Sequence, residues 1–228
     1  MTDVPPEAVR IAVDDATRVS GLLQMPTGAR ACCVLAHGAG AGMTHRFMAD
    51  VADGLGRRGI ATLRYQFVYM ERGSKRPDAP PLAHAAVRAA VAHAAKLAPG
   101  LPLFAGGKSF GGRMTSQAQA GAPLPGVRGL VFLGFPLHPA KQPSDARAAH
   151  LAQIDVPMLF LQGTRDELAD MQLLRPVVKS LRSLATLVSF ADADHSFHVP
   201  ARSGRSDAEV LAELCGAAAG WMDGIARG

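Results

Sequence analysis

The chain of 228 residues contains only three cysteines, and no two of them form a Cys-x-x-Cys pair. An odd cysteine count argues against a disulfide framework. Cys32 and Cys33 are adjacent inside an apolar run, and Cys215 lies in a segment with a helical pattern. We therefore expect three buried free thiols in a protein of a reducing compartment.

Long apolar runs are also missing, and none approaches the 18 residues that a membrane-spanning helix needs. The first residues, MTDVPPEAVR, have no basic segment followed by an apolar stretch, so no signal peptide is expected and the cytoplasm is the default location. The formal net charge is +5, with Lys and Arg scattered except in one stretch. This charge is too mild to indicate a nucleic-acid partner, and nothing indicates a membrane partner.

What the chain does have is a globular composition, with 48% apolar and 19% charged residues and no repeat, low-complexity tract or linker. Its length suits a single domain covering residues 1–228, large enough to bury roughly 70% of the unfolded surface. Short, often β-branched apolar runs alternate with longer helical patterns. This alternation predicts an α/β fold with three layers, in which helices cover both faces of a mostly parallel sheet of about seven to eight strands.

The expected elements follow one another with short connections. Two modest strands lie in residues 9–25, and further strands are expected in the runs ACCVLAH, IATLRY, LPLFAGG, LVFLGFPL, VPMLFLQG and ATLVSF. Helical patterns fill MTHRFMADVADGLGRRG, the alanine-rich PPLAHAAVRAAVAHAAKLAPG and SFGGRMTSQAQA. No insertion is long enough to form a large lid domain.

The last helix carries the clearest local signals. Ser206 and Glu209 have the spacing of a capping box, in which the serine caps the helix and the glutamate reaches back. An apolar stripe at helical spacing then follows, made of Val210, Leu214, Ala217, Trp221 and Ile225. We expect this stripe to pack in the core rather than to bind a cofactor.

One serine stands among glycines in the segment AGGKSFGGRM, directly after the strand LPLFA. Gly107 and Gly111 flank Ser109 at two residues on each side, which gives the pattern G-x-S-x-G between a strand and a helix. In so tight a turn the flanking positions nearly touch each other, so a Cβ at either would clash. The turn would hold Ser109 in a strained conformation with its hydroxyl clear of the sheet, as a nucleophile requires. Lys108, next to it, is interpreted as a surface charge.

A serine nucleophile needs a base, and the base needs an acid that orients it. His195 follows the strand ATLVSF, and Asp166 follows the strand VPMLFLQG, so both should reach the edge of the sheet that carries Ser109. Glu167 and Asp170 remain alternatives for the acid. The remaining alternative for the base is His198, three residues beyond His195. The pair His195-x-x-His198 has no carboxylate or cysteine cluster beside it, so no metal site is expected.

Such a site also needs donors for the oxyanion. The N–H of Phe110, just after Ser109, is one candidate. The other should come from the loop LAHGAGAGM after an earlier strand, where Ala39 is favoured and Gly40 is the alternative. His37, in the same loop, is expected to hold the turn by hydrogen bonding.

Taken together, HGAGAGM, GGKSFGG, QGTRDE and DADHSF resemble the α/β-hydrolase superfamily, in its small dienelactone-hydrolase-like branch. The finer resemblance, which includes RYQFVYMERGSKRPD and GFPLHPAKQP, is to bacterial proteins related to eukaryotic testis-expressed and histone-acetyltransferase-complex subunits. It covers most of the chain and implies an α/β-hydrolase fold with a Ser109–Asp166–His195 triad in the family's chain order. Dienelactone hydrolases proper carry cysteine where Ser109 stands, so their substrate is not carried over.

The expected activity is cleavage of a small-molecule acyl ester through an acyl-enzyme, with no metal or organic cofactor. The longest irregular stretch near the rim, QFVYMERGSKRPDAPP, suggests Tyr69 and Arg72 as substrate-binding residues, and His138 after the strand LVFLGF as a third. The alternative for the stretch is a solvated loop whose aromatic residues pack onto the domain. The alternative for the whole chain is a binding or scaffold protein that keeps the fold without turnover, and the oligomeric state is unreadable from the sequence.

Overall fold

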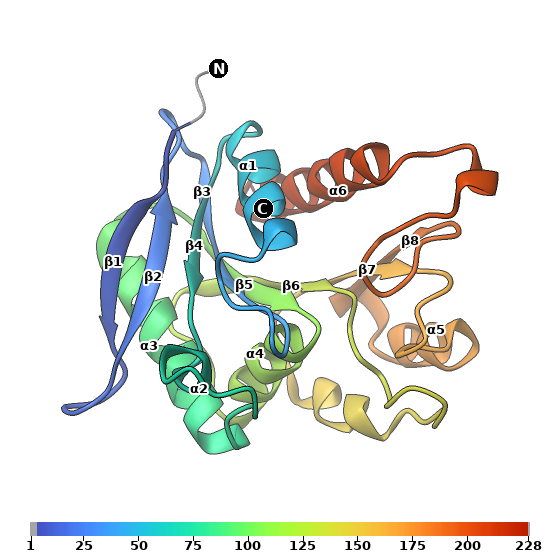
Figure 1. The fold of residues 1–228 in the computed structure, drawn as a ribbon, viewed down its shortest axis with the longest axis horizontal. Coiled ribbons are helices and arrows are strands. Elements are labelled where there is room, and N and C mark those ends of the chain that lie inside the picture. The colour runs from blue at the N-terminus through green and yellow to red at the C-terminus, as the bar shows by residue number, and fades with distance from the viewer. Residues whose placement is uncertain (1–3, 228) are drawn as a thin grey trace.

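A computed structural model describes residues 4–227 and contains one eight-stranded sheet with the strand order β1-β2-β4-β3-β5-β6-β7-β8 (Figure 1). β1 and β2 pair antiparallel, β2 is antiparallel to β4, and all remaining neighbours are parallel. The strands are β1 (Glu7–Ala12), β2 (Arg18–Gln24), β3 (Ala31–Ala36), β4 (Ile60–Tyr65), β5 (Leu103–Lys108), β6 (Val127–Leu133), β7 (Met158–Gly163) and β8 (Ala185–Phe190).

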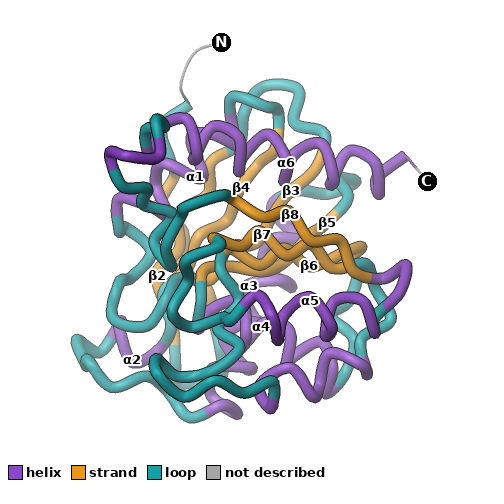
Figure 2. Tube along the Cα trace, turned by 90° about the vertical axis from the view of Figure 1, so that its right-hand side faces the viewer, coloured by secondary structure: helices purple, strands orange, loops and turns teal. Residues whose placement is uncertain are grey.

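Helices cover both faces of this sheet, which forms the middle of three layers (Figure 2). α1 and α6 lie on one face, and α3, α4 and α5 lie on the other. The helices are α1 (Arg46–Gly56), α2 (Val68–Glu71), α3 (Pro80–Leu97), α4 (Phe110–Gly121), α5 (Met171–Ser180) and α6 (Asp207–Arg227). Short 3₁₀ segments occupy Ala146–Gln153, Arg182–Leu184 and Ala201–Ser203.

The central strands are apolar along their whole length because both of their faces are covered. In β3 every residue is buried, with Cys32 and Val34 on the side of α3 and Cys33 and Leu35 on the side of α1. Alternate residues therefore feed two separate cores, one on each face of the sheet. All three cysteines are buried and free, as the sequence predicts.

The three-layer arrangement predicted from the alternation of patterns is confirmed. The capping box is also present: the Glu209 N–H donates to Ser206 Oγ, and the Ser206 N–H donates to Glu209 Oε2. Helix α5 was not anticipated from the sequence. Its N-cap is Asp170, whose side chain accepts from the Gln172 N–H. Pro176 lies within the helix, and because proline is unfavourable at such positions the sequence of this segment is typical of a loop.

The order in which successive strands are added to the sheet reverses at β3. β4 adds to one side of β3 and β5 to the other, so the loops after β3 and β5 open a crevice at the carboxyl ends of these strands. No part of residues 4–227 forms a separate lid domain over this edge. None of the helices described combines the length and apolarity needed to cross a bilayer.

The packing of α6 can be tested by truncation. Leu214 is fully buried in the core beneath α1 and α6, so Leu214→Ala should lower the free energy of unfolding by about 2–5 kcal/mol through lost burial and a cavity. Leu211, only partly buried on the same helix, provides the matched control Leu211→Ala and should cost clearly less. Urea denaturation measures both variants, and equal losses would contradict the described orientation of α6.

Candidate active site

Ser109 sits at the sharp turn between β5 and α4, with φ 50° and ψ −115°. This is a left-handed conformation that a residue with a side chain adopts only under strain. Glycine is required on both sides, as expected, and the structure shows which atoms leave no room for a side chain. The nearest atom to a Cβ at Gly107 or Gly111 would be the carbonyl oxygen of Ala36 in β3, at 2.1 Å or 2.5 Å. The turn is therefore pressed against the end of the neighbouring strand.

The structure brings Ser109, His195 and Asp166 together from three separate loops. His195 Nε2 lies 2.8 Å from Ser109 Oγ, and His195 Nδ1 lies 2.7 Å from Asp166 Oδ2. The Asp166 side chain is fully buried, whereas the His195 side chain is 24% exposed. These contacts therefore run from a solvent-excluded carboxylate to the hydroxyl of Ser109, which lines a cavity.

A polar group that the sequence analysis did not single out holds the carboxylate of Asp166. Gln162 of β7 donates through Nε2 to Asp166 Oδ2 at 2.5 Å and accepts from the Phe135 N–H at 2.9 Å. The Leu168 N–H donates to the other carboxylate oxygen at 2.8 Å. Gln162 is a fully buried polar residue in an otherwise apolar strand, and that exception to the pattern was the available signal.

The alternative residues lie elsewhere. Glu167 is exposed, and Asp170 caps α5. The side chain of His198 is 63% exposed and pairs with Asp207 at 2.9 Å, which raises the pKa of His198 through that hydrogen bond and charge. Among residues 4–227 no three His, Cys, Asp or Glu side chains are grouped so as to hold a metal ion.

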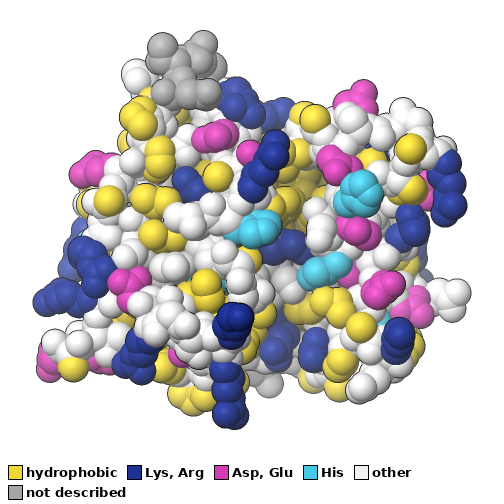
Figure 3. Space-filling model, viewed as in Figure 1, with side chains coloured by type: hydrophobic (Ala, Val, Ile, Leu, Met, Phe, Trp, Pro, Cys, Tyr) yellow, Lys and Arg dark blue, Asp and Glu magenta, His cyan; other side chains and the backbone are white. Residues whose placement is uncertain are grey.

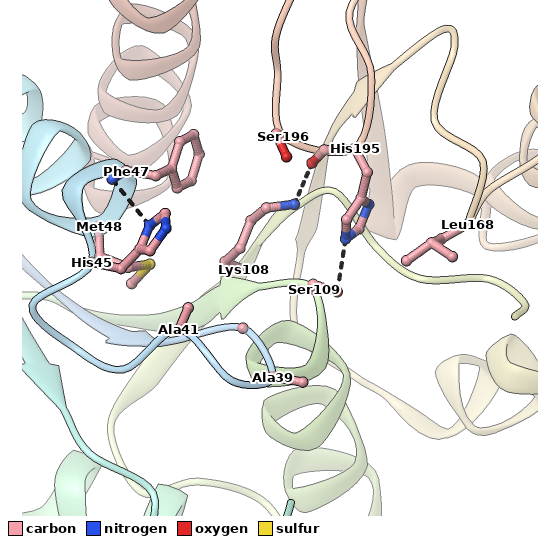
Figure 4. A pocket seen from close by; sticks show the side chains of 11 residues that line it. Ala39, Ala41, His45, Phe47, Met48, Lys108, Ser109, Leu168, His195 and Ser196 are labelled. Atoms are coloured by element: carbon pink, nitrogen blue, oxygen red, sulfur yellow. Dashed lines mark hydrogen bonds between the residues drawn. The ribbon is translucent and has the colours of Figure 1, made fainter. Parts of the chain in front are cut away.

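Two backbone N–H groups border Ser109. Phe110 is the first residue of α4, so its N–H has no partner within the helix. Within the described residues no hydrogen bond engages the N–H of Ala39, which lies on the loop beneath Ser109 (Figure 4). The Gly40 N–H, by contrast, donates to the hydroxyl of Tyr69 at 3.0 Å. The geometry thus favours Ala39 over Gly40 as the second donor.

His37 holds this loop as expected. The ring is fully buried; its Nδ1 contacts the Gly38 carbonyl oxygen at 2.7 Å, and its Nε2 accepts from the Phe67 N–H at 3.1 Å. Because Nε2 accepts, Nδ1 carries the proton, and burial lowers the pKa of the ring so that it stays neutral. Phe67 and Tyr69 then pack against Phe110 with ring centroids 5.2 Å and 6.4 Å away.

A cavity of about 360 Å³ opens above Ser109. Figure 3 shows a hollow in the middle of this face, bordered by histidine side chains. The cavity walls combine small, apolar and basic residues: Gly38, Ala39, Ala41, His45, Phe47, Met48, Lys108, Ser109, Leu168, His195 and Ser196. No carboxylate is among these lining residues.

None of the three expected substrate-binding residues lines this cavity. Tyr69 is buried with its hydroxyl against the loop of Gly40, and Arg72 is exposed on the surface. His138 is buried as well, with Nδ1 at the Pro139 carbonyl oxygen and Nε2 accepting from the Asp170 N–H. The prediction that these three residues line the cavity is therefore wrong. Their closeness in sequence to the strand ends did not reveal that the side chains of Tyr69 and His138 point into the protein.

The interpretation of Lys108 as a surface charge is also wrong. Its side chain runs along the cavity, and Nζ donates to the main-chain carbonyl of His195 at 2.5 Å (Figure 4). Burial lowers the pKa of the ammonium to about 8, against the opposing charges of Asp166 and Asp194.

Solved structures from several organisms share this fold. Dienelactone hydrolase from Anabaena variabilis is 22% identical, with a TM-score of 0.75 over 96% of this chain and 97% of that one. A serine hydrolase without lid from Xanthomonas campestris is 19% identical, with a TM-score of 0.74 over 97% of both chains. The esterase domain of a Rhodothermus marinus protein is 15% identical, with a TM-score of 0.71 over 95% of this chain and 97% of that one.

A family model described as an alpha/beta hydrolase domain matches residues 29–223, which includes the turn at Ser109, Asp166 and His195. The match extends from just before β3 nearly to the end of α6, and it supports hydrolase activity in general terms. The chain therefore belongs to the α/β-hydrolase domain family.

Proposed function

We propose that the protein is a serine hydrolase that cleaves small carboxylic esters through an acyl-enzyme on Ser109. The observation that carries this proposal is the unbroken relay from Asp166 through His195 to Ser109, with contacts of 2.7 Å and 2.8 Å at the floor of a cavity. Two structural neighbours, the dienelactone hydrolase and the esterase domain, have names consistent with ester cleavage.

In the first step Ser109 Oγ attacks the carbonyl carbon of the ester while His195 Nε2 takes the hydroxyl proton. Asp166 keeps the Nδ1 proton in place and stabilises the imidazolium that forms. The negative oxygen of the tetrahedral intermediate lies toward the N–H groups of Phe110 and Ala39, a type of donor worth about 3 kcal/mol each. The intermediate collapses as the bond to the leaving alcohol breaks, and His195 returns the proton to that alcohol.

In the second step water attacks the acyl group on Ser109. His195 takes a proton from the water, and the bond between the acyl carbon and Ser109 Oγ breaks with return of that proton to the serine. The products are a carboxylic acid and the restored enzyme. A cavity of about 360 Å³ lies at the lower end of the range for small-ligand sites, which favours short acyl groups.

The role of Ser109 is tested by Ser109→Ala, which removes the only hydroxyl that contacts His195 among the described residues. The variant should lose labelling by a fluorophosphonate probe and hydrolysis of p-nitrophenyl butyrate, while its thermal unfolding stays close to that of the wild type. Ser180→Ala, at the end of α5, is the matched control and should label normally. Persistent labelling of Ser109→Ala would exclude this nucleophile.

The role of Asp166 is tested against its neighbour. Asp166→Asn should lower kcat by about 10⁴-fold, because an amide favours the wrong histidine tautomer. Glu167→Gln, one residue further along the chain and exposed, should leave kcat unchanged. Steady-state kinetics with p-nitrophenyl butyrate measures both, and the reverse order of effects would assign the acid to Glu167.

A further inference from the structure

Among the residues that the structure describes, Lys108 is the one ammonium that lines the cavity, and the mechanism above does not use it. It is the last residue of β5 and directly precedes Ser109. Its Nζ lies 5.5 Å from the ring centre of Phe197 and 5.9 Å from that of Phe47. Within residues 4–227 it forms no direct ion pair with a carboxylate, so its principal polar partner is the main-chain carbonyl of His195.

The path of the Lys108 side chain depends on a gap at the end of β6. A Cβ on Gly134 would lie 2.9 Å from Lys108 Nζ and 3.5 Å from both Asp166 Oδ2 and His195 Cε1. Gly134 also has φ +72°, a conformation that favours glycine. The missing side chain therefore lets the ammonium pass over β6 and reach the loop that carries His195.

That loop is joined to the sheet by the Arg165 N–H, which donates to the Ala193 carbonyl, and by Phe197, which packs on Phe190 of β8 at 5.6 Å. Residues 194–198 form a turn closed mainly on itself: the Asp194 N–H donates to the His198 carbonyl, and Asp194 Oδ1 accepts from the N–H groups of Ser196 and His198. Phe197, with φ +63°, stacks on Phe47 at 5.8 Å. A bond from Lys108 fixes the backbone of this turn to the strand end that also holds Ser109.

We propose that Lys108 is a positioning residue, which fixes His195 relative to Ser109 by binding the His195 carbonyl through a charged hydrogen bond. The expected effect on kcat rests on the proposed function. The bond between Lys108 and the His195 carbonyl does not depend on that function. Lys108 and Ser109 are consecutive, so movement of the strand end carries nucleophile and base together. A charged donor to a carbonyl is stronger than a neutral one.

The charge of Lys108 also links activity to pH. The groups that face it are Asp166 after β7, Asp194 and His195 after β8, and His45 across the cavity at the start of α1. Burial places the pKa of the ammonium at about 8. Lys108 is therefore fully charged well below pH 8 and loses its charge as the pH rises through about 8, so kcat should fall on the alkaline side.

The test compares Lys108→Met with the wild type and with Lys96→Met, an exposed lysine at the end of α3. With p-nitrophenyl butyrate, a neutral ester, Lys108→Met should lose about 100-fold in kcat, as expected for a misplaced base, with little change in KM. Its alkaline fall near pH 8 should be absent. Lys96→Met should match the wild type in every respect.

Lys108→Cys followed by reaction with 2-bromoethylamine restores an amine side chain of the same length, in which a sulfur atom replaces the γ-methylene group of lysine. The three native cysteines are buried and their thiol pKa values are raised by burial, so they should not react. The modified protein should regain kcat and show an alkaline fall at lower pH, because the new ammonium is more acidic. If Lys108 only filled space, the pH at which kcat falls on the alkaline side would not change in the modified protein.

Hydrogen–deuterium exchange provides a readout that does not require activity. Lys108→Met should raise exchange in residues 191–199, and Lys96→Met should not. Unchanged exchange together with unchanged kcat in Lys108→Met would overturn the proposal. An increase in KM for the anionic ester monomethyl glutarate, with no change in kcat, would also overturn it, because Lys108 would then be a substrate ligand. Failure of the proposed function is distinct, since the wild type itself would then neither hydrolyse the ester nor label.

Discussion

The close approach of the turn at Ser109 to the end of β3 is the constraint on which the site depends. With no Cβ at Gly107 and Gly111, the backbone of the turn rests against Ala36, and Ser109 is held at a positive φ. Such a conformation costs on the order of 1–3 kcal/mol, and the packing of α4 and β5 in the core offsets it. The loop that follows Ala36 carries Ala39, which lines the same cavity as Ser109.

From this contact the rest of the site is built by neighbouring strand ends. β7 carries the buried Gln162 and is followed by Asp166, which Gln162 holds. β8 leads into the loop of His195, and Gly134, directly after β6, has no side chain and so leaves room between them. Each group therefore follows the end of a different strand. His195 lies in a loop rather than on a strand, and the bond from Lys108 joins the backbone of that loop to the end of β5.

Much of this could be predicted from the sequence, and the physical reasons are specific. The layers follow from uniformly apolar strands alternating with helical patterns, and Ser109 stands out because glycines at fixed spacing interrupt such a strand. Lys108 could not be placed, because the path of its side chain depends on Gly134, which is remote in sequence. Tyr69 and His138 were assigned to the cavity, but each satisfies its polar atoms inside the protein, a choice that depends on partners brought near only by folding.

The most direct measurement of the central claim is to trap the acyl group itself. The protein is mixed with p-nitrophenyl acetate, quenched in acid during turnover, digested and analysed by mass spectrometry. The account predicts one acetylated peptide, with the acetyl group on Ser109, and its disappearance when the quench follows exhaustion of the ester. An acetyl group on another residue during turnover, or turnover with no acylated peptide, would contradict it.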